Sequence, residues 1–299
     1  MRRAAVVMHP GKVHDAAGFR STVELAMADG GWAEPLWLET KPDDTGERLT
    51  RQALRSGVEL VLACGGDGTV SACVAGAAGS GVPLGLLPCG TGNLLARNLG
   101  LPASLDEALA VALTGSDHPL DVGLINDRTF VVMAGIGFDA EMLGGASEDA
   151  KARMGWLAYV LSGLRHMGDR PTWVRLRADG GRAWRCLASS VVIGNVGSLR
   201  GGIRLMPDAR PDDGLLDVAV LTARGWAGWL QLAVDVTLKR STSRLRYLAC
   251  RELRVDVSRA WRWEVDGDVE GFARRLIVTV QPGSLLVRVP AAEPEGAAS

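Results

Sequence analysis

Residues 58–69 read Val-Glu-Leu-Val-Leu-Ala-Cys-Gly-Gly-Asp-Gly-Thr, an apolar run that leads directly into three glycines around one aspartate. The apolar part predicts a buried β-strand, and residues 70–78 after the glycines predict a helix of small residues. Gly65, Gly66 and Gly68 let backbone N–H groups approach an anion closely, and a helix N-terminus favours phosphate. The segment therefore predicts a phosphate-binding loop in an α/β domain, and Asp67 suits a Mg²⁺–phosphate centre. The alternative is a tight turn capped by Asp67. The pattern is neither a Walker A motif nor a clean G-x-G-x-x-G.

A second loop of the same kind lies about 25 residues further along the chain. Residues 88–97 read Pro-Cys-Gly-Thr-Gly-Asn-Leu-Leu-Ala-Arg and follow a strand expected at 83–87. The loop offers backbone donors, the Thr91 hydroxyl and the Asn93 amide, and Arg97 would lie one helical turn beyond Asn93. Loops at the carboxyl ends of parallel strands can form opposite walls of one site. We therefore expect the two glycine-rich loops to face one ligand.

The pattern of elements changes along the chain. The first part alternates strand-like runs at 4–8, 32–39, 58–64 and 83–87 with helical patterns at 15–30, 50–56 and 70–78. This alternation predicts a parallel sheet covered by helices. After residue 121 short strand-like runs dominate, at 129–133, 173–178, 184–193, 216–221, 253–257, 276–280 and 285–289, with helices expected at 155–167 and 226–238. We expect an α/β domain at 1–120, a mostly antiparallel β domain at 121–290 and a disordered tail at 291–299.

Composition excludes several classes of protein. The net charge of −1 argues against nucleic-acid binding, which requires a basic excess. Five cysteines without a C-x-x-C pair predict neither a disulfide framework nor a zinc site. Residues 68–96 carry no formal charge, but their glycines and prolines make a poor helix, so we interpret them as buried strand, loop and helix in a soluble domain. The apolar run after Met1 is too short for a signal peptide, so we expect a cytoplasmic protein.

Taken together, the two loops resemble the catalytic domain of the diacylglycerol kinase and sphingosine kinase family of lipid kinases, particularly its soluble bacterial members. Gly135–Ala140 is similar to the Gly-x-Gly segment that opens the family's second domain. Asn195, followed by Pro207–Ala209 and Asp212–Val218, resembles its P-x-A…D-D-G-x-L-x-V block, and Val265–Asp268 falls where the family carries D-G-E. The glycine loop alone is shared with NAD kinases, whereas the full ordered set is specific.

The resemblance implies a phosphofructokinase-like N-terminal α/β domain, a β-rich C-terminal domain and an active site between them. It assigns ATP phosphates to Gly65, Gly66, Asp67, Gly68 and Thr69, with Asp67 organising Mg²⁺. It places Gly90, Thr91 and Asn93 along the nucleotide or the acceptor hydroxyl, with Thr40 and Arg97 as weaker candidates. The family's structural-metal aspartate corresponds to Asp213 or to its neighbour Asp212. The alternative for this last pair is an ordinary turn between strands.

By position in the motif, the catalytic base is Asp268, where the family usually carries glutamate. Aspartate is one methylene shorter, about 1.5 Å less reach. A misplacement of about 1 Å can cost on the order of 100-fold in rate. Glu270, two residues on and expected on the same strand face, is the fallback base. Two further departures are His9-Pro10 in place of Asn-Pro, and Leu94 where an aspartate often follows the asparagine.

The resemblance thus predicts an ATP- and Mg²⁺-dependent lipid kinase that phosphorylates a primary hydroxyl, with diacylglycerol, giving phosphatidic acid, as the leading substrate. The alternatives are an NAD kinase and a weakly active lipid-binding or regulatory protein of the same fold. The expected partner is a lipid at the membrane surface, met through transient peripheral contact at the inner face. The helix at 226–238 is a candidate for this contact, and the alternative, which we favour, is an amphipathic helix packed on the β domain. No nucleic-acid partner is expected. The lipid itself and the oligomeric state, a homodimer included, stay open.

Overall fold

The computed structural model describes all residues except 14, 138–170, 199–204, 238–241 and 292–299. The chain forms two compact units, Met1–Leu120 with Gly283–Ser299, and Asp121–Pro282. It passes from one unit to the other within β5 (Ser116–Ile125) and again within β14 (Asp268–Val289). Residues 283–290, which the sequence analysis assigned to the second domain, therefore belong to the first unit. There Val287 pairs with Leu84, and the Gly79 N–H donates to the Ser284 carbonyl at 2.7 Å.

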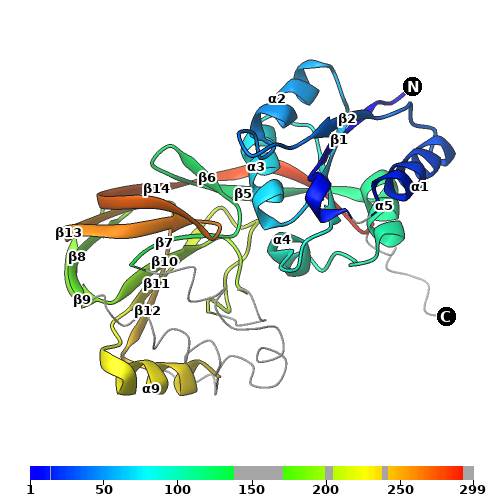
Figure 1. Ribbon diagram of the computed structural model, residues 1–299. Helices are drawn as coiled ribbons and strands as arrows, with labels where there is room; N and C mark the ends of the chain where they lie inside the picture. Colours follow the sequence, from blue (N-terminus) through cyan, green and yellow to red (C-terminus); the bar gives the residue numbers. More distant parts are fainter. Residues whose placement is uncertain (14, 138–170, 199–204, 238–241, 292–299) are drawn as a thin grey trace, which may run out of the picture. The chain divides into compact units, whose positions relative to one another are not determined.

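The first unit is built on a parallel sheet in the order β2-β1-β3-β4, of which β1 and β2 are labelled in Figure 1. Its strands are β1 (Ala4–Met8), β2 (Leu36–Glu39), β3 (Leu60–Gly65) and β4 (Leu84–Pro88). Its helices are η1 (Pro10–Lys12), α1 (Ala16–Asp29), α2 (Glu47–Arg55), α3 (Asp67–Ala77), α4 (Leu94–Asn98) and α5 (Leu105–Thr114). Apolar residues alternate between the two faces of each strand, so both faces need cover.

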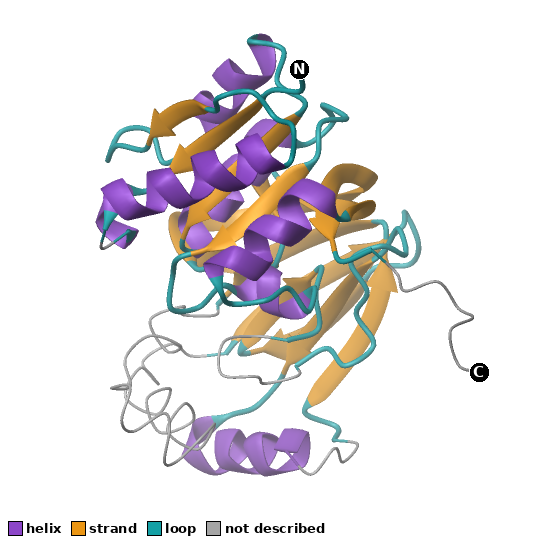
Figure 2. Ribbon diagram, turned by 90° about the vertical axis from the view of Figure 1, so that its right-hand side faces the viewer, coloured by secondary structure: helices purple, strands orange, loops and turns teal. Residues whose placement is uncertain are grey.

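The helices of the first unit pack in two pairs. Apolar side chains of α1 and α5, such as Val23 and Leu109, share one core with alternate side chains of β1 and β3, such as Val6 and Leu62. The helices α2 and α3 pack against each other, and α3 lies against β3. Figure 2 shows helices on the sheet of this unit. A parallel sheet buried in this way leaves its strand ends as the places where loops can meet a ligand.

The second unit is mostly antiparallel. Its strands β12, β11, β10, β7, β13 and β14 follow one another in hydrogen-bonded order, β8 pairs with β13, and β9 pairs with β8. Their bounds are β6 (Arg128–Phe130), β7 (Met133–Ile136), β8 (Thr172–Ala178), β9 (Trp184–Ala188), β10 (Ser190–Gly194), β11 (Leu216–Leu221), β12 (Leu245–Cys250) and β13 (Glu252–Val265). One apolar core, with Trp261 and Phe130 among its largest side chains, unites these strands.

The predicted fold class is confirmed: a parallel α/β part is followed by an antiparallel β part. Some elements differ in extent. The run at 184–193 forms two strands, β9 and β10, because the strand conformation is interrupted at Ser189. The two runs at 276–280 and 285–289 are parts of the single long strand β14. Helix α5 and the strands β5 and β12 were not predicted from the sequence. The helix expected at 155–167 lies outside the described residues.

The helix expected at 226–238 is present as α9 (Gly225–Thr237). Leu232 on this helix is buried, whereas Val234 is partly exposed. Among the helices of the described residues, none is long and apolar enough to cross a bilayer. Contact between α9 and a membrane stays a prediction.

Candidate functional site

The loops with the predicted phosphate-binding residues leave one edge of the parallel sheet. In the strand register Met8 is opposite Glu39 and Cys64, and Gly65 is opposite Pro88, so β1 to β4 end at the same edge. Thr40 follows β2, is buried, and its N–H donates to the Met8 carbonyl at 2.9 Å. The sheet thus gathers the predicted residues of the first unit along a single edge.

The two glycine-rich loops touch backbone to backbone. The Cys89 N–H donates to the Gly65 carbonyl at 3.1 Å. A Cβ atom on Gly90 would lie 2.6 Å from the Cα atom of Gly66, and one on Gly65 would lie 2.6 Å from the Cβ atom of Thr69. Only glycine fits at these positions. Glycine at these positions keeps Cβ atoms out of the space between the loops, which a close approach of the backbone to an anion requires.

Asp67 ties the two loops together. The sequence analysis placed Asp67 in a loop, but helix α3 already begins at this residue. Its carboxylate oxygen Oδ1 accepts a hydrogen bond from the N–H of Leu94, the first residue of α4, at 2.6 Å. The negative charge of Asp67 is thus placed in the first turn of one helix and against the first N–H of another, where a carboxylate is favoured.

Asn93 acts on its own loop. Its Oδ1 atom accepts from the Gly90 N–H at 3.1 Å, and its Nδ2 atom donates to the Gly90 carbonyl at 2.7 Å. The residue has a φ of 48°, a left-handed conformation that asparagine tolerates better than most residues. Arg97 donates from Nη2 to the Thr91 carbonyl at 3.3 Å, and the Thr91 side chain is exposed. The structure therefore assigns Asn93 and Arg97 a role in holding the loop that carries Thr91.

Lys12 is a residue that the sequence analysis missed. It ends the short helix η1, directly after β1, and its Cε atom lies 4.0 Å from where a Cβ atom on Gly66 would be. The lysine is exposed and places an ammonium group within reach of the glycine loop. The signal was available in the sequence, since a lysine follows the strand end at His9-Pro10-Gly11, but only the sheet order places that strand end beside Gly66.

A pair of thiols lies directly behind the loops. The Sγ atoms of Cys64, at the end of β3, and Cys89, after β4, are 3.2 Å apart. This contact and burial raise the pKa of the buried Cys64 thiol, whereas the hydrogen bond from Cys64 lowers the pKa of Cys89. The proton therefore stays on Cys64, and Cys89 is the first of the two to ionise.

In the second unit, the predicted base stands next to a tightly bound aspartate. The Asp266 carboxylate accepts hydrogen bonds from the N–H groups of Val131 at 3.1 Å, Val132 at 2.9 Å and Met133 at 3.0 Å. Asp266 thereby fixes the two-residue turn between β13 and β14, and Asp268 follows this turn as the exposed first residue of β14. The sequence analysis quoted Asp266 within a motif and gave it no role.

Glu270, the predicted fallback base, is already engaged. It forms an ion pair with Arg128 at 2.8 Å. It is also the extra residue of a β-bulge, since Glu264 pairs with Val269 and Trp263 pairs with Gly271. A bulge interrupts the alternation of side chains, so spacing alone does not place Glu270 on the same face as Asp268. Its role as a base stays a prediction.

The loop before β11, which carries Asp212 and Asp213, is bonded to the buried side chain of Asp121. Asp121 accepts from the Gly214 N–H at 2.6 Å, and Asp213 accepts from the Leu215 N–H at 3.0 Å in a local turn. Burial, and then the charges of Asp213 and Asp208, raise the pKa of Asp217. Asp212 is exposed.

Among the described residues, no three His, Cys, Asp or Glu side chains form a group that could hold a metal by themselves. Asp213 as a metal ligand stays a prediction.

The predicted residues thus form two sets. Thr40, Gly65–Thr69, Gly90, Thr91, Asn93 and Arg97 belong to the first unit, and Asp212, Asp213, Asp268 and Glu270 belong to the second. The first set shares one sheet edge with Lys12. In the second set, Asp212 and Asp213 lie on the loop before β11, and Asp268 and Glu270 lie at the start of β14.

Family models match both parts of the chain. A diacylglycerol kinase catalytic domain model matches residues 14–125, and a model of the YegS C-terminal NAD kinase beta sandwich-like domain matches residues 131–289. A "Probable lipid kinase YegS-like" of Pseudomonas aeruginosa (strain UCBPP-PA14) is 35% identical over 269 residues, covering 85% of this chain and 84% of the relative. A "Probable lipid kinase YegS" of Salmonella typhimurium is 30% identical, covering 96% of each chain.

Solved structures show the same fold. A diacylglycerol kinase from Bacillus anthracis str. Sterne superposes with a TM-score of 0.77 and 22% identity, covering 98% of this chain and 97% of that chain. An NAD kinase from Archaeoglobus fulgidus in complex with ATP has a TM-score of 0.52 and 13% identity, covering 96% of this chain and 93% of that chain. The match to the second domain model spans more than half of the chain, and the sequence relatives span nearly all of it. The chain therefore belongs to the diacylglycerol kinase-like family of lipid kinases with a YegS-type C-terminal domain.

Proposed function

We propose that the chain is an ATP- and Mg²⁺-dependent lipid kinase that phosphorylates a primary hydroxyl, with diacylglycerol as the substrate and phosphatidic acid as the product. The observation that carries the proposal is the backbone contact between Gly66 and Gly90 at the edge of the parallel sheet. It supports a cradle for a phosphate chain, because no Cβ atom at Gly66 or Gly90 stands between the two loops, so the backbone of each can approach an anion closely.

The ATP phosphates would bind over Gly65–Thr69 and the loop around Thr91. Lys12 supplies the positive charge that the glycine loop lacks, and its reach to Gly66 supports a contact with the terminal phosphates. Phosphoryl transfer asks the protein chiefly for positioning and for neutralisation of charge. Rigid N–H groups together with one lysine meet both needs.

Asp67 is the residue that would hold Mg²⁺. The donor set fits this ion, because Mg²⁺ is commonly held by one or two carboxylates with substrate phosphates and water completing its shell. When bound, the ion would neutralise charge on the phosphates. Asp67 itself also keeps the two loops in register through Leu94.

Asp268 is the proposed general base. It would take the proton of the lipid hydroxyl while the hydroxyl oxygen bonds to the terminal phosphorus and the bond from phosphorus to ADP breaks. Its support is its position in the motif and its exposure directly after the turn that Asp266 fixes by accepting from three N–H groups. A lipid at the membrane surface is the partner that this reaction requires, and we propose peripheral contact from the cytoplasm. The oligomeric state, including a homodimer, belongs to the same set of open proposals.

The decisive experiment is ATP-dependent phosphorylation of a panel of lipids by the purified chain. The panel contains diacylglycerol, a sphingoid base, phosphatidylglycerol and an isoprenoid alcohol, each dispersed in detergent, with Asp67→Ala as the control. We expect labelled phosphatidic acid from the wild type and none from the variant. Label on no lipid would reject the proposal, and label on another lipid would reject diacylglycerol alone.

Two observations favour competing functions. The resemblance to the fold of an NAD kinase motivates a coupled assay for conversion of NAD to NADP, in which we expect no turnover. The aspartate at 268 motivates the alternative that the chain is a weakly active lipid-binding protein. The variant Asp268→Glu distinguishes this alternative from an active lipid kinase. Loss of activity in Asp268→Glu would show a pocket built around aspartate. A large gain would favour the weakly active alternative.

A further inference from the structure

A groove on the sheet of the second unit carries an excess of positive charge. It has a volume of about 910 Å³ and is lined by residues of β8, β9, β13 and β14. Five arginines line it: Arg175, Arg185, Arg254, Arg274 and Arg275. Asp256 is the single acidic residue among its lining residues. The whole chain has a net charge of −1, so this excess of positive charge is a local feature of the groove.

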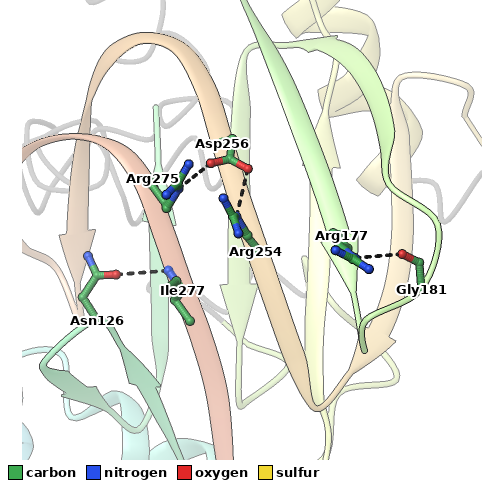
Figure 3. A network of polar contacts seen from close by, with 7 residues as sticks. All are labelled: Asn126, Arg177, Gly181, Arg254, Asp256, Arg275 and Ile277. Carbon is green, nitrogen blue, oxygen red and sulfur yellow. Dashed lines mark hydrogen bonds and ion pairs between the residues drawn. The ribbon is translucent and has the colours of Figure 1, made fainter.

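Asp256 organises two of the arginines. Its carboxylate accepts from the Nε atom of Arg275 at 2.6 Å and from that of Arg254 at 3.1 Å, as Figure 3 shows. Burial by itself would raise the pKa of Asp256, but the hydrogen bonds from Arg275 and Arg254 lower it. The aspartate therefore stays charged and fixes two guanidinium groups. It leaves the groove with a net excess of positive charge.

The other three arginines of the groove form no ion pair with Asp256, although Arg175 lies opposite it in the strand register. In the strand register Arg185 is opposite Arg175, and Arg175 is opposite Asp256, which places them in one row across β9, β8 and β13. Within the part of the chain that the structure describes, Arg175, Arg185 and Arg274 have no ion-pair partner. Like charges directly opposite on neighbouring strands are destabilising. A bound anion would relieve this repulsion.

Trp173 supplies an apolar group at the same place. It lies on β8 two residues before Arg175, lines the groove, and is 58% exposed. Tryptophan beside arginine is typical of surfaces that meet the boundary between lipid headgroups and acyl chains. A nucleic acid is disfavoured because the remainder of the chain offers no basic excess to support it.

We propose that this arginine groove docks the second unit onto anionic phospholipid headgroups of a bilayer. The choice of a bilayer over other anions rests on the proposed lipid kinase function, since a lipid substrate resides there. The arginines would bind headgroup phosphates as bidentate donors, and Trp173 would insert at the level of the headgroups. The groove is distinct from the phosphate loops, which belong to the first unit.

The test is co-sedimentation of the full chain, without ATP, with phosphatidylcholine vesicles that do or do not contain phosphatidylglycerol. A basic side chain near an anionic membrane contributes enough for about fivefold in binding. We therefore expect Arg175→Gln/Arg185→Gln to bind the anionic vesicles on the order of 25-fold more weakly than wild type. The matched control is Arg182→Gln/Arg251→Gln, which removes the same charge at exposed positions of the same unit outside the groove. We expect it to bind as wild type.

Kinase activity on lipid in detergent is measured in parallel and keeps the two proposals apart. If vesicle binding depends on the groove but no lipid is phosphorylated, the proposed function fails and the docking site stands. The docking proposal is overturned if the groove variant binds as wild type, or if binding does not depend on phosphatidylglycerol. It is also overturned if inorganic phosphate or DNA binds the groove while vesicles do not, or if the groove variant converts a dimer into monomers without changing vesicle binding.

Discussion

The carboxylate of Asp67 accepts the N–H of Leu94 at 2.6 Å, so the charge expected at the phosphate site also joins the two loops that form it. Because Asp67 has both roles, two substitutions of this residue should have different effects. Asp67→Asn keeps an oxygen acceptor for Leu94 and loses the charge, whereas Asp67→Ala loses both.

We expect Asp67→Asn to lose activity by about 100-fold or more, because removal of one preorganised electrostatic group at a reaction centre has an effect of that size. Its free energy of unfolding should stay close to wild type. Asp67→Ala should lose the same activity and, in addition, about 1 kcal/mol of stability, as expected for a partly exposed hydrogen bond to a charged group. Urea unfolding and a lipid kinase assay measure the two effects. Equal stability of the two variants would contradict the joining role.

Gly90→Ala tests the contact between the loops. The added Cβ atom would lie 2.6 Å from the Gly66 Cα atom, so the loops must separate. We expect nucleotide affinity, measured by calorimetric titration of ATP with Mg²⁺, to fall by about tenfold or more, which corresponds to about 1.4 kcal/mol.

Gly68→Ala is the comparison for stability. A Cβ atom there meets nothing within 4 Å, and the residue lies in the first turn of α3, where alanine is the better helix former. Its melting temperature should equal or exceed that of wild type, while Gly90→Ala should melt lower. A reversed order would show that the loops tolerate separation.

The thiol pair predicts a pH dependence of alkylation. The hydrogen bond from Cys64 lowers the pKa of Cys89, so the reactive thiolate of Cys89 should form at a lower pH than in an ordinary cysteine, whose pKa is about 8.5. Cys64 is buried and its pKa is raised, so it should resist iodoacetamide over the same range. Mass spectrometry of peptides from protein alkylated across a pH series gives both rates. Cys64→Ala removes the donor, and the midpoint for Cys89 should then move up. An unchanged midpoint would refute the coupling.

Asp266→Ala should be among the more destabilising substitutions in the second unit. It would leave three N–H groups without their acceptor, and we expect a loss of about 3 kcal/mol on unfolding by denaturant. Asp266→Asn keeps one acceptor oxygen and tolerates the φ of 48°, so it should lose clearly less. If both variants were as stable as wild type, the turn before Asp268 would not depend on this carboxylate.

The sequence predicted β1, β3 and β4 well, because each is a short apolar run with glycine or proline at its end or within two residues of it, whereas β2 is shorter than the predicted run at 32–39. It also predicted that two loops meet, because parallel strands end at one edge. It could not predict that α3 starts at Asp67, since glycine and threonine are poor helix formers and Gly68 and Thr69 follow this residue directly.

Residues that act across long separations were beyond prediction. The role of Asp266 depends on N–H groups about 135 residues away in the chain, and that of Lys12 depends on which strand lies next to β3. The groove is invisible in the sequence for the same reason. Arg175, Arg185 and Arg275 are separated along the chain, and only the strand register places them in one row.

The return of β14 to the first unit has a consequence for synthesis. Residues 283–289 contribute to the unit that holds the phosphate loops, with Val287 beside Leu84 and Arg288 bound to Asp117 at 3.0 Å. A ribosome that has finished the first 120 residues has therefore not yet supplied all of that unit. Its completion must wait until the second unit has been translated, so a chain terminated early would carry every glycine of the loops and still lack the strand that closes the unit around them.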